Sequence, residues 1–280
     1  MPSSTPVATA HGPTSAAATA VPSFNARLAD AIERTGSLVC VGLDPRLDRL
    51  ETPLADFCRR IVDATIEAAV AFKPNSAFFE QLGAEGWRAL ETVVRHIGGA
   101  RIVVLDAKRG DIGPTAEAYA RAAFGAIGAD AVTVSPYLGG DAVGPFLADP
   151  GRGAFVLCHT SNPGAQDLQT LPVDGRPLYL HVADLVAARW NGNDNAGLVV
   201  GATYPAALEA VRDAAPRLPF LVPGIGAQGG DVEAALAAGL DRAGGGLVVN
   251  SSREILYADD PGTAARRLRD ALNAARARHR

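Results

Sequence analysis

Residues 103–112 read VVLDAKRGDI, an apolar run that leads directly into a cluster of charges. The β-branched beginning predicts a buried strand. Side chains along a strand alternate between its two faces, so Asp106 and Lys108 point the same way, as an ion pair, if the strand runs through them. Asp111 lies beyond Gly110 and is less able to turn back to the same side. The segment therefore predicts a strand that carries charged chemistry at its carboxyl end.

The same order of apolar run and polar end recurs along the chain, with Ala-rich helical stretches between the runs. Asp44 and Asn250 follow the first and the last run and are seven units apart, so one unit takes about 29 residues, the length of a β/α unit. This pattern predicts an α/β fold, a single-domain (β/α)8 barrel of the TIM type. The eight predicted strands are Leu38–Leu43, Ala69–Phe72, Arg101–Leu105, Ala131–Val134, Ala154–Leu157, Gly197–Val200, Phe220–Val222 and Leu247–Val249.

A doubly wound open sheet is the main structural alternative. Such a sheet usually has fewer strands and a first turn of the GxGxxG type, whereas the first turn here reads Gly42-Leu43-Asp44-Pro45. In a barrel, the carboxyl ends of all strands meet on one face, where the active site forms. The polar residues after the strands are therefore expected around one mouth.

The composition limits the partners and the compartment. Of the 280 residues, 48% are hydrophobic and 20% are charged, which allows a large core. The net charge of −4 attracts neither nucleic acid nor an anionic membrane, so neither is expected as a partner. The three cysteines, Cys40, Cys58 and Cys158, form no CxxC pair and are expected as reduced core thiols.

The ends of the sequence add two expectations. Residues 1–23 are rich in Pro, Ser, Thr and Ala and predict a disordered tail before a catalytic domain over residues 24–280. This beginning lacks the basic and apolar regions of a signal peptide, and no apolar run reaches the length of a membrane span. We therefore expect a cytoplasmic protein.

Lysine is rare in this chain. Only Lys73 and Lys108 are lysines among the 26 basic residues; the others are arginines. A lysine ammonium can transfer a proton, whereas an arginine guanidinium keeps its proton. Both lysines follow or end predicted strands, so their placement favours a functional role over chance retention on the surface.

Five ordered motifs resemble the longer bacterial branch of the orotidine 5′-phosphate decarboxylases over roughly residues 24–275. They are VGLDP (41–45), FKPN (72–75), DAKRGDI (106–112), TSNPG (160–164) and PGIGAQGG (223–230). The resemblance implies a carboxy-lyase, a carbon-carbon lyase of pyrimidine biosynthesis that converts orotidine 5′-phosphate to UMP and carbon dioxide. It implies no cofactor and no metal.

The resemblance also implies roles for the charged residues. Lys108 would protonate the carbanion at pyrimidine C6, and Asp106 would lie against the departing carboxylate. Asp44 and Lys73 would complete the charged network and hold the ribose hydroxyls. Asp111, with Ile112 and Thr115, would enter the active site of the partner subunit in a homodimer with shared sites, which accounts for the awkward direction of Asp111.

The remaining implied roles concern the phosphate and the base. Phosphate sites of barrels commonly lie in the last two βα loops. The resemblance assigns the phosphate to Gln228, beside Pro223 and Gly224 after the seventh strand, and to Arg253 after the eighth. Arginine suits this role because it donates two parallel hydrogen bonds. Ser135 matches the position that reads the amide edge of the pyrimidine.

Other interpretations remain open at this point. Asp111 can instead cap a helix that begins near Pro114, and Ser135 can cap the following turn. His159 is as consistent with a structural role as with a functional one. A related metal-dependent barrel that acts on sugar-acid phosphates needs an additional carboxylate near strand two, where this chain has Lys73-Pro74-Asn75. A catalytically silent phosphosugar-binding barrel would have no need for both lysines and three aligned aspartates.

Overall fold

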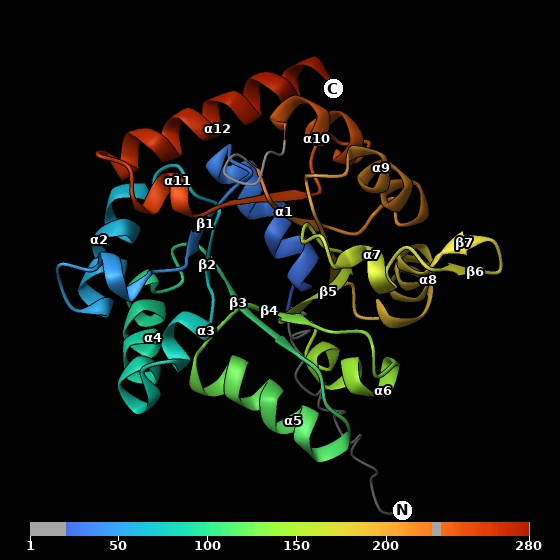
Figure 1. Cartoon of the computed structure of the whole chain (residues 1–280), viewed down its shortest axis with the longest axis horizontal. Coiled ribbons are helices and arrows are strands. Elements are labelled where there is room, and N and C mark those ends of the chain that lie inside the picture. The colour runs from blue at the N-terminus through green and yellow to red at the C-terminus, as the bar shows by residue number, and fades with distance from the viewer. Residues whose placement is uncertain (1–20, 226–230, 280) are drawn as a thin grey trace, which may run out of the picture.

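The computed structural model describes residues 21–225 and 231–279, and its centre is a closed barrel of eight parallel strands (Figure 1). Around the barrel the order is β1-β10-β9-β8-β5-β4-β3-β2. The predicted (β/α)8 barrel is confirmed, and so are all eight predicted strands. Their bounds are β1 Val39–Leu43, β2 Ala71–Pro74, β3 Ile102–Arg109, β4 Ala131–Val134, β5 Gly153–His159, β8 Ala196–Val200, β9 Phe220–Pro223 and β10 Leu247–Ser251.

The strands read as nearly continuous apolar runs because both of their faces are covered. β1, β8 and β10 are buried along their whole lengths. One face of each strand fills the barrel interior, and the other packs against the surrounding helices, as in other parallel sheets. The barrel closes where Cys40 of β1 pairs with Ala71 of β2 on one side and with Asn250 of β10 on the other.

Amphipathic helices form the outer layer (Figure 1). In α4, the buried residues Leu90, Val93, Val94 and Ile97 recur at helical spacing, and the helix ends at Gly98 in the left-handed conformation. The helices are α1 Phe24–Thr35, α2 Leu54–Thr65, α3 Ala77–Glu80, α4 Gly83–Ile97, α5 Gly113–Arg121, α6 Gly140–Val143, α7 Ala165–Leu168, α8 Leu178–Leu185, α9 Pro205–Ala214, α10 Val232–Gly239, α11 Arg253–Leu256 and α12 Pro261–Arg278.

Helix α1 closes the end of the barrel at which the strands begin. Phe24, at its first position, is fully buried and meets the ring of Phe155 edge to face at 5.9 Å between centroids. Arg27 pairs with Asp130, just before β4, at 2.5 Å. The opposite end, where the strands finish, stays open for chemistry. The tail expected over residues 1–23 remains a prediction, because residues 1–20 lie outside the described part.

A two-stranded hairpin, β6 Pro172–Val173 with β7 Arg176–Pro177, follows α7 and was not predicted. Its turn is the dipeptide Asp174-Gly175, and both residues have positive φ, 48° and 77°. Asp-Gly is a typical sequence for a tight hairpin turn. The signal was present, but strands of two residues are too short for an alternating pattern to reveal.

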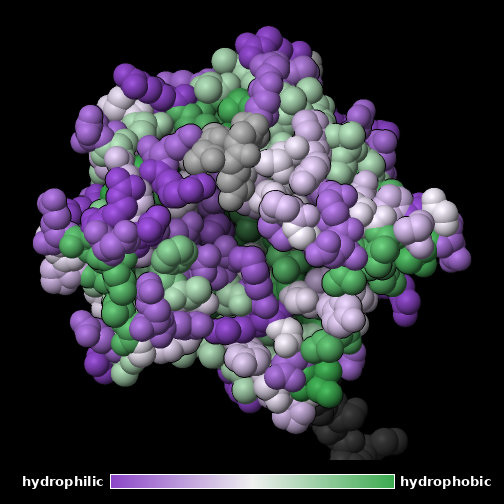
Figure 2. Space-filling model, viewed as in Figure 1, coloured by the Kyte–Doolittle hydropathy of each residue, from purple (hydrophilic) through white to green (hydrophobic). Residues whose placement is uncertain are grey.

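Two further expectations about the core and the surface can be compared with the structure. All three cysteines are free and buried, which confirms them as core thiols. Within residues 21–225 and 231–279, no helix combines the length and apolar character that a membrane span needs. The open end of the barrel has a hollow surrounded mainly by hydrophilic residues (Figure 2).

Candidate active site

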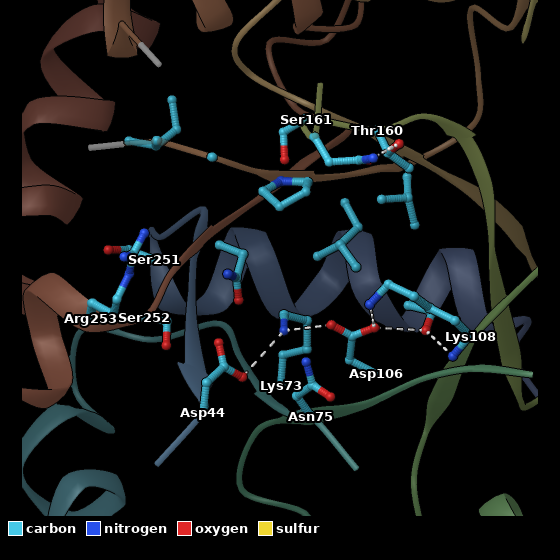
Figure 3. A pocket seen from close by; sticks show the side chains of 18 of the residues that line it. Asp44, Lys73, Asn75, Asp106, Lys108, Thr160, Ser161, Ser251, Ser252 and Arg253 are labelled. Atoms are coloured by element: carbon cyan, nitrogen blue, oxygen red, sulfur yellow. Dashed lines mark hydrogen bonds and ion pairs between the residues drawn. The ribbon is translucent and has the colours of Figure 1, made fainter. Parts of the chain in front are cut away.

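A cavity of about 610 Å³ lies at the carboxyl ends of the strands (Figure 3). Its size suits a nucleotide-sized ligand. Polar side chains reach it from strands or loops far apart in the sequence, as the barrel predicts. Those that line it include Asp44, Lys73, Asn75, Asp106, Lys108, Thr133, Thr160, Ser161, Asn162, Asn250, Ser252 and Arg253.

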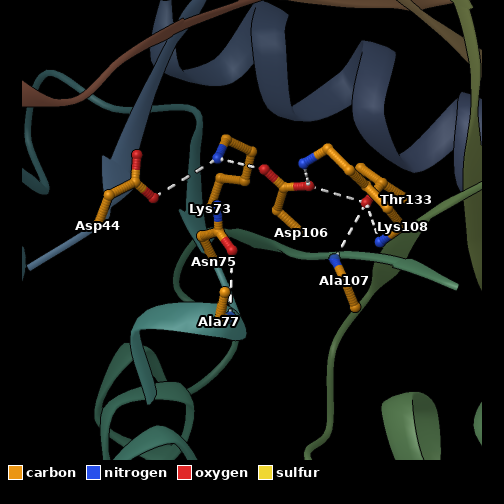
Figure 4. A network of polar contacts seen from close by, with 8 residues as sticks. All are labelled: Asp44, Lys73, Asn75, Ala77, Asp106, Ala107, Lys108 and Thr133. Atoms are coloured by element: carbon orange, nitrogen blue, oxygen red, sulfur yellow. Dashed lines mark hydrogen bonds and ion pairs between the residues drawn. The ribbon is translucent and has the colours of Figure 1, made fainter. Parts of the chain in front are cut away.

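Four of these residues form a chain of alternating charges (Figure 4). Lys73 Nζ lies 2.9 Å from Asp106 Oδ2 and 3.8 Å from Asp44 Oδ1. Lys108 Nζ lies 2.6 Å from the other Asp106 oxygen, Oδ1. The predicted ion pair between Asp106 and Lys108 is therefore present, and Lys73 joins it to Asp44. Both oxygens of Asp106 face an ammonium group.

The environment keeps this network charged. Burial alone would raise the pKa of Asp106, but the ammonium groups of Lys73 and Lys108 outweigh it and hold that pKa well below its usual range. Burial alone would lower the pKa of Lys73, but Asp106 and Asp44 outweigh it and raise that pKa above its usual value. Asp106 is thus an anion and Lys73 a cation at neutral pH.

Strand β3 bulges where it carries this chemistry. Its register against β4 shifts between Leu105 and Arg109, and Lys108 has a φ of 47°, in the left-handed region. Thr133 of β4 contacts the bulge through its hydroxyl, which donates to Asp106 Oδ1 at 2.9 Å. Sequence reasoning missed Thr133. A signal existed, since it is a polar residue in an otherwise apolar buried strand.

The last two strands present groups suited to a phosphate. Pro223, the last residue of β9, and Gly224 after it line the cavity, and Arg253 lines it at the start of α11. Asn250 Oδ1 and Ser252 Oγ are buried there without a hydrogen-bond partner in the described structure, so a ligand can supply one. Gln228, assigned to the phosphate from the sequence, lies outside the described residues.

The close approach between β1 and the segment at the end of β10 requires a glycine in β1. A Cβ atom added at Gly42 would lie 2.9 Å from the Cβ of Ser252 and 3.0 Å from Asn250 Oδ1. The first distance is shorter than real Cβ contacts, and the second would require the Asn250 side chain to move. Gly42, in the GLDP turn, lets the end of β10 and the residues after it lie directly against β1.

Asp111, Ile112 and Thr115 do not line the cavity of their own chain. Asp111 Oδ1 accepts a hydrogen bond from the Ile112 amide at 2.8 Å, and Ile112 occupies the N-cap position of α5 without a side-chain cap. The alternative interpretation of Asp111 as the helix cap is therefore wrong. Ile112 is 57% exposed, which is unusual for a large apolar side chain.

Two serines in loops at the carboxyl ends of the strands differ in their position relative to the cavity. Ser135 lies beside Gly110, and its hydroxyl is 3.5 Å from the Tyr137 amide; it is not among the residues that line the cavity. Ser161, in the loop after β5, lines it. The assignment of Ser135 to the base stays a prediction, and Ser161 is a second hydroxyl that the sequence analysis quoted within a motif but did not select.

His159 lies at the end of β5 and is buried between two aromatic rings. The centroid of its imidazole is 4.8 Å from that of Tyr179 and 4.9 Å from that of Tyr204, both edge to face. Burial lowers its pKa below the usual value. Among the described residues, no group of three His, Cys, Asp or Glu side chains is arranged to hold a metal ion.

The barrel and its mouth define the class: a (β/α)8-barrel protein with a buried network of carboxylates and lysines at the catalytic face. Comparison with known proteins gives the family. Residues 37–268 match the model of the "Orotidine 5'-phosphate decarboxylase / HUMPS family", and the chain belongs to that family.

Individual relatives agree with this family over most of their lengths. The orotidine 5′-phosphate decarboxylase of Roseiflexus castenholzii is 53% identical over 257 residues, which cover 86% of this chain and 94% of the relative. The enzyme of the same name from Cupriavidus metallidurans is 52% identical and covers 84% and 89%. The solved structure of Leishmania donovani OMP decarboxylase is 49% identical, with a TM-score of 0.85 and coverage of 91% and 98%.

Proposed function

We propose that this protein is an orotidine 5′-phosphate decarboxylase, a carboxy-lyase that forms UMP and carbon dioxide in pyrimidine biosynthesis. The observation that carries the proposal is Asp106, held between two ammonium groups at 2.9 and 2.6 Å at the mouth of the barrel. The relatives that are about half identical and bear this name support the same substrate.

The reaction needs positive charge at one carbon atom. When the bond between C6 and the carboxyl group breaks, its electron pair stays on C6 and carbon dioxide leaves. An ammonium about 4 Å from that carbanion contributes on the order of 4 kcal/mol at an effective dielectric constant of 20. Lys108 supplies this charge and then transfers a proton to C6. Its Nζ is fixed by Asp106, and its side chain is 50% exposed towards the cavity.

The other site residues hold the nucleotide. We assign the ribose hydroxyls to Asp44 and Lys73, which border the charged network, and the phosphate to Arg253, Gln228, Pro223 and Gly224. Arg253 supports this assignment because it lines the far side of the cavity near Ser252 and can donate bidentate hydrogen bonds. The pyrimidine then lies towards Lys108, and the assignment of its amide edge to Ser135 stays part of the proposal.

A homodimer with shared active sites is part of the proposal. Asp111, Ile112 and Thr115 lie outside the cavity of their own chain, which supports a role in the neighbouring site. Exposed apolar side chains gather in the two loops around Gly110, where Ile112, Tyr137 and Leu138 are 57%, 81% and 47% exposed. Burial of such a patch favours association of two copies.

Two further assignments complete the proposal. The catalytic unit includes α1, which begins at Phe24 and closes the barrel, and the assignment of residues 1–23 to a tail stays a prediction. The three free, buried thiols suit a reducing compartment, so we place the protein in the cytoplasm.

A metal-dependent activity on sugar-acid phosphates is less well supported. Such a site needs carboxylates that are free to bind a cation, but here the Lys73 ammonium already lies between Asp44 and Asp106. A silent binding protein is disfavoured because Lys108 is held ready for proton transfer at the cavity. Conversion of orotidine 5′-phosphate to UMP by the purified protein, followed by ultraviolet absorbance, tests the proposal directly.

A further inference from the structure

The bulge in β3 leaves several residues opposite a single residue of β4. Leu105 pairs with Val132, whereas Arg109 pairs with Val134. Three residues of β3 therefore lie between these two pairs, but only Thr133 lies between them on β4. A bulge of this kind interrupts the ladder, so the amides within it need other acceptors.

The Thr133 hydroxyl supplies those acceptors (Figure 4). Its oxygen accepts hydrogen bonds from the amides of Ala107 at 3.1 Å and Lys108 at 2.9 Å, and its proton is donated to Asp106 Oδ1 at 2.9 Å. A hydroxyl has one donor and two acceptor sites, so all of them are used. The side chain is 1% exposed, so water cannot easily replace it.

The backbone that this hydroxyl holds is strained. Lys108 has a φ of 47°, which residues with a side chain rarely adopt outside functional sites. The next residue, Arg109, is fixed independently: it pairs with Glu80 at 2.5 Å, and its carbonyl accepts from the Ser135 amide at 2.7 Å. Thr133 is the described side chain that joins the turn at Lys108 to the carboxylate of Asp106.

We propose that Thr133 is a positioning residue for the decarboxylation, an inference that rests on the proposed function. Its hydroxyl holds the left-handed turn at Lys108 and the rotation of the Asp106 carboxylate together, so that the ammonium of Lys108 is directed at the reacting carbon. Thr133 acts through these two residues and transfers no proton to the substrate.

The substitution Thr133→Val tests this role because it keeps the shape and removes the hydroxyl. Misplacement of a reacting group by about 1 Å can cost about 100-fold in rate, so we expect kcat to fall about 100-fold. The affinity for UMP should change less than about threefold, because binding of the product does not require Lys108 to be placed for proton transfer. Thr133→Ser keeps the hydroxyl and should restore kcat to within about fivefold of the original protein.

Thr65→Val is the matched control. Thr65 is equally buried, and its hydroxyl donates to the Ile61 carbonyl at 2.7 Å within α2, away from the cavity. This variant should lose a buried hydrogen bond and keep kcat. If Thr133→Val does not fold, Thr133→Cys, which has a weaker donor and acceptor, takes its place and should fall between the serine and valine proteins.

The proposal is overturned if Thr133→Val keeps kcat within threefold, or if kcat and UMP affinity fall in parallel. A chain that binds UMP without decarboxylating orotidine 5′-phosphate would instead refute the proposed function. Amide exchange of Ala107 and Lys108 then decides the positioning role: it should be at least about tenfold faster in Thr133→Val than in Thr133→Ser, because the two amides lose their acceptor. Equal exchange in the two proteins would overturn it.

Discussion

Lys73 Nζ lies 2.9 Å from Asp106 Oδ2, and both side chains are almost completely buried. Lys108, on the other oxygen of the same carboxylate, is half exposed. We therefore expect the two lysines to have different tasks. Lys73 balances buried negative charge from Asp106 and Asp44, whereas Lys108 has access to a ligand and can transfer a proton. The following predictions separate these tasks.

Lys108→Arg should abolish most of the activity. Arginine keeps a positive charge beside Asp106, but it does not release its proton near neutral pH. General acid catalysis typically contributes 10² to 10⁴ in rate, so we expect kcat to fall about 10³-fold, with UMP affinity within about fivefold of the original protein. Steady-state kinetics and calorimetry measure these values. An arginine variant within tenfold of the original kcat would show that charge alone suffices.

Asp106→Asn should destabilise the fold. It leaves Lys73 buried with Asp44 3.8 Å away. Breaking a buried pair by removing one partner costs about 3–5 kcal/mol, and urea unfolding should show a loss in that range. Asp44→Asn is the control, and we expect a smaller loss because Asp44 is more exposed and farther from Lys73. A loss below 1 kcal/mol for Asp106→Asn would contradict this account.

The pH dependence of the stability lost in Asp106→Asn follows from the pKa shifts of Asp106 and Lys73. The pKa of Asp106 is lowered in the folded protein. Its contribution to the free energy of unfolding is therefore present above the unfolded pKa of about 3.9, and it is lost as the pH falls through the folded pKa. The pKa of Lys73 is raised in the folded protein. Its contribution to the free energy of unfolding is therefore present below the unfolded pKa of about 10.4, and it is lost as the pH rises through the folded pKa. Urea unfolding at pH 5 and 7 should therefore give the same difference in the free energy of unfolding between the original protein and Asp106→Asn.

The sequence predicted the barrel and the Asp106–Lys108 pair because both depend on local pattern. The eight strands repeat apolar runs, and the expected alternation along β3 pointed to the pair, although Lys108 reaches Asp106 from a bulge with a φ of 47° and not from a regular strand. The bulge was not predictable in this way. It depends on the register between β3 and β4, which brings the Thr133 hydroxyl under Lys108.

Loop residues were the least predictable. Ser135 and Ser161 both follow strands, and their sequences alone do not reveal which loop bends over the cavity; only Ser161 lines it. The direction of Asp111 was anticipated from the intervening Gly110. Its proposed destination is the active site of a second subunit, and no pattern within one chain fixes how two copies associate.

Mixing two inactive variants tests the shared site. Lys108→Ala and Asp111→Ala should each be inactive as homodimers. After subunit exchange, half of the dimers should be mixed, and each should hold one intact site, so about one quarter of the original activity should return. Mass spectrometry of the exchanged dimers provides the control. Full exchange without recovered activity would rule out shared sites.

His159 should make stability depend on pH. Burial lowers its pKa in the folded protein, so as the pH falls through about 6.5 the unfolded chain takes up a proton that the folded chain does not. Stability should therefore decrease from pH 7.5 to pH 5.5, by at most about 1.4 kcal/mol per pH unit from this residue. His159→Phe should show a flatter profile in urea unfolding. Parallel pH profiles of stability for the original protein and His159→Phe would contradict the assignment of this pH dependence to His159.

Packing of α1 under the barrel should be essential for stability. Phe24 is fully buried against Phe155. Phe24→Ala should cost about 3–5 kcal/mol through lost burial and the cavity left behind. Thermal and urea unfolding measure this loss, and replacement of the exposed Val21 by Ala is the control, with no change expected. A loss below 1 kcal/mol for Phe24→Ala would show that the helix does not close the barrel in solution.

The most direct measurement is the decay of orotidine 5′-phosphate absorbance with purified protein, with and without excess EDTA, beside Lys108→Ala. The account predicts conversion to UMP at a rate that the chelator does not change, and no conversion by the variant. Absence of conversion by the folded original protein, or conversion that EDTA abolishes, would contradict it.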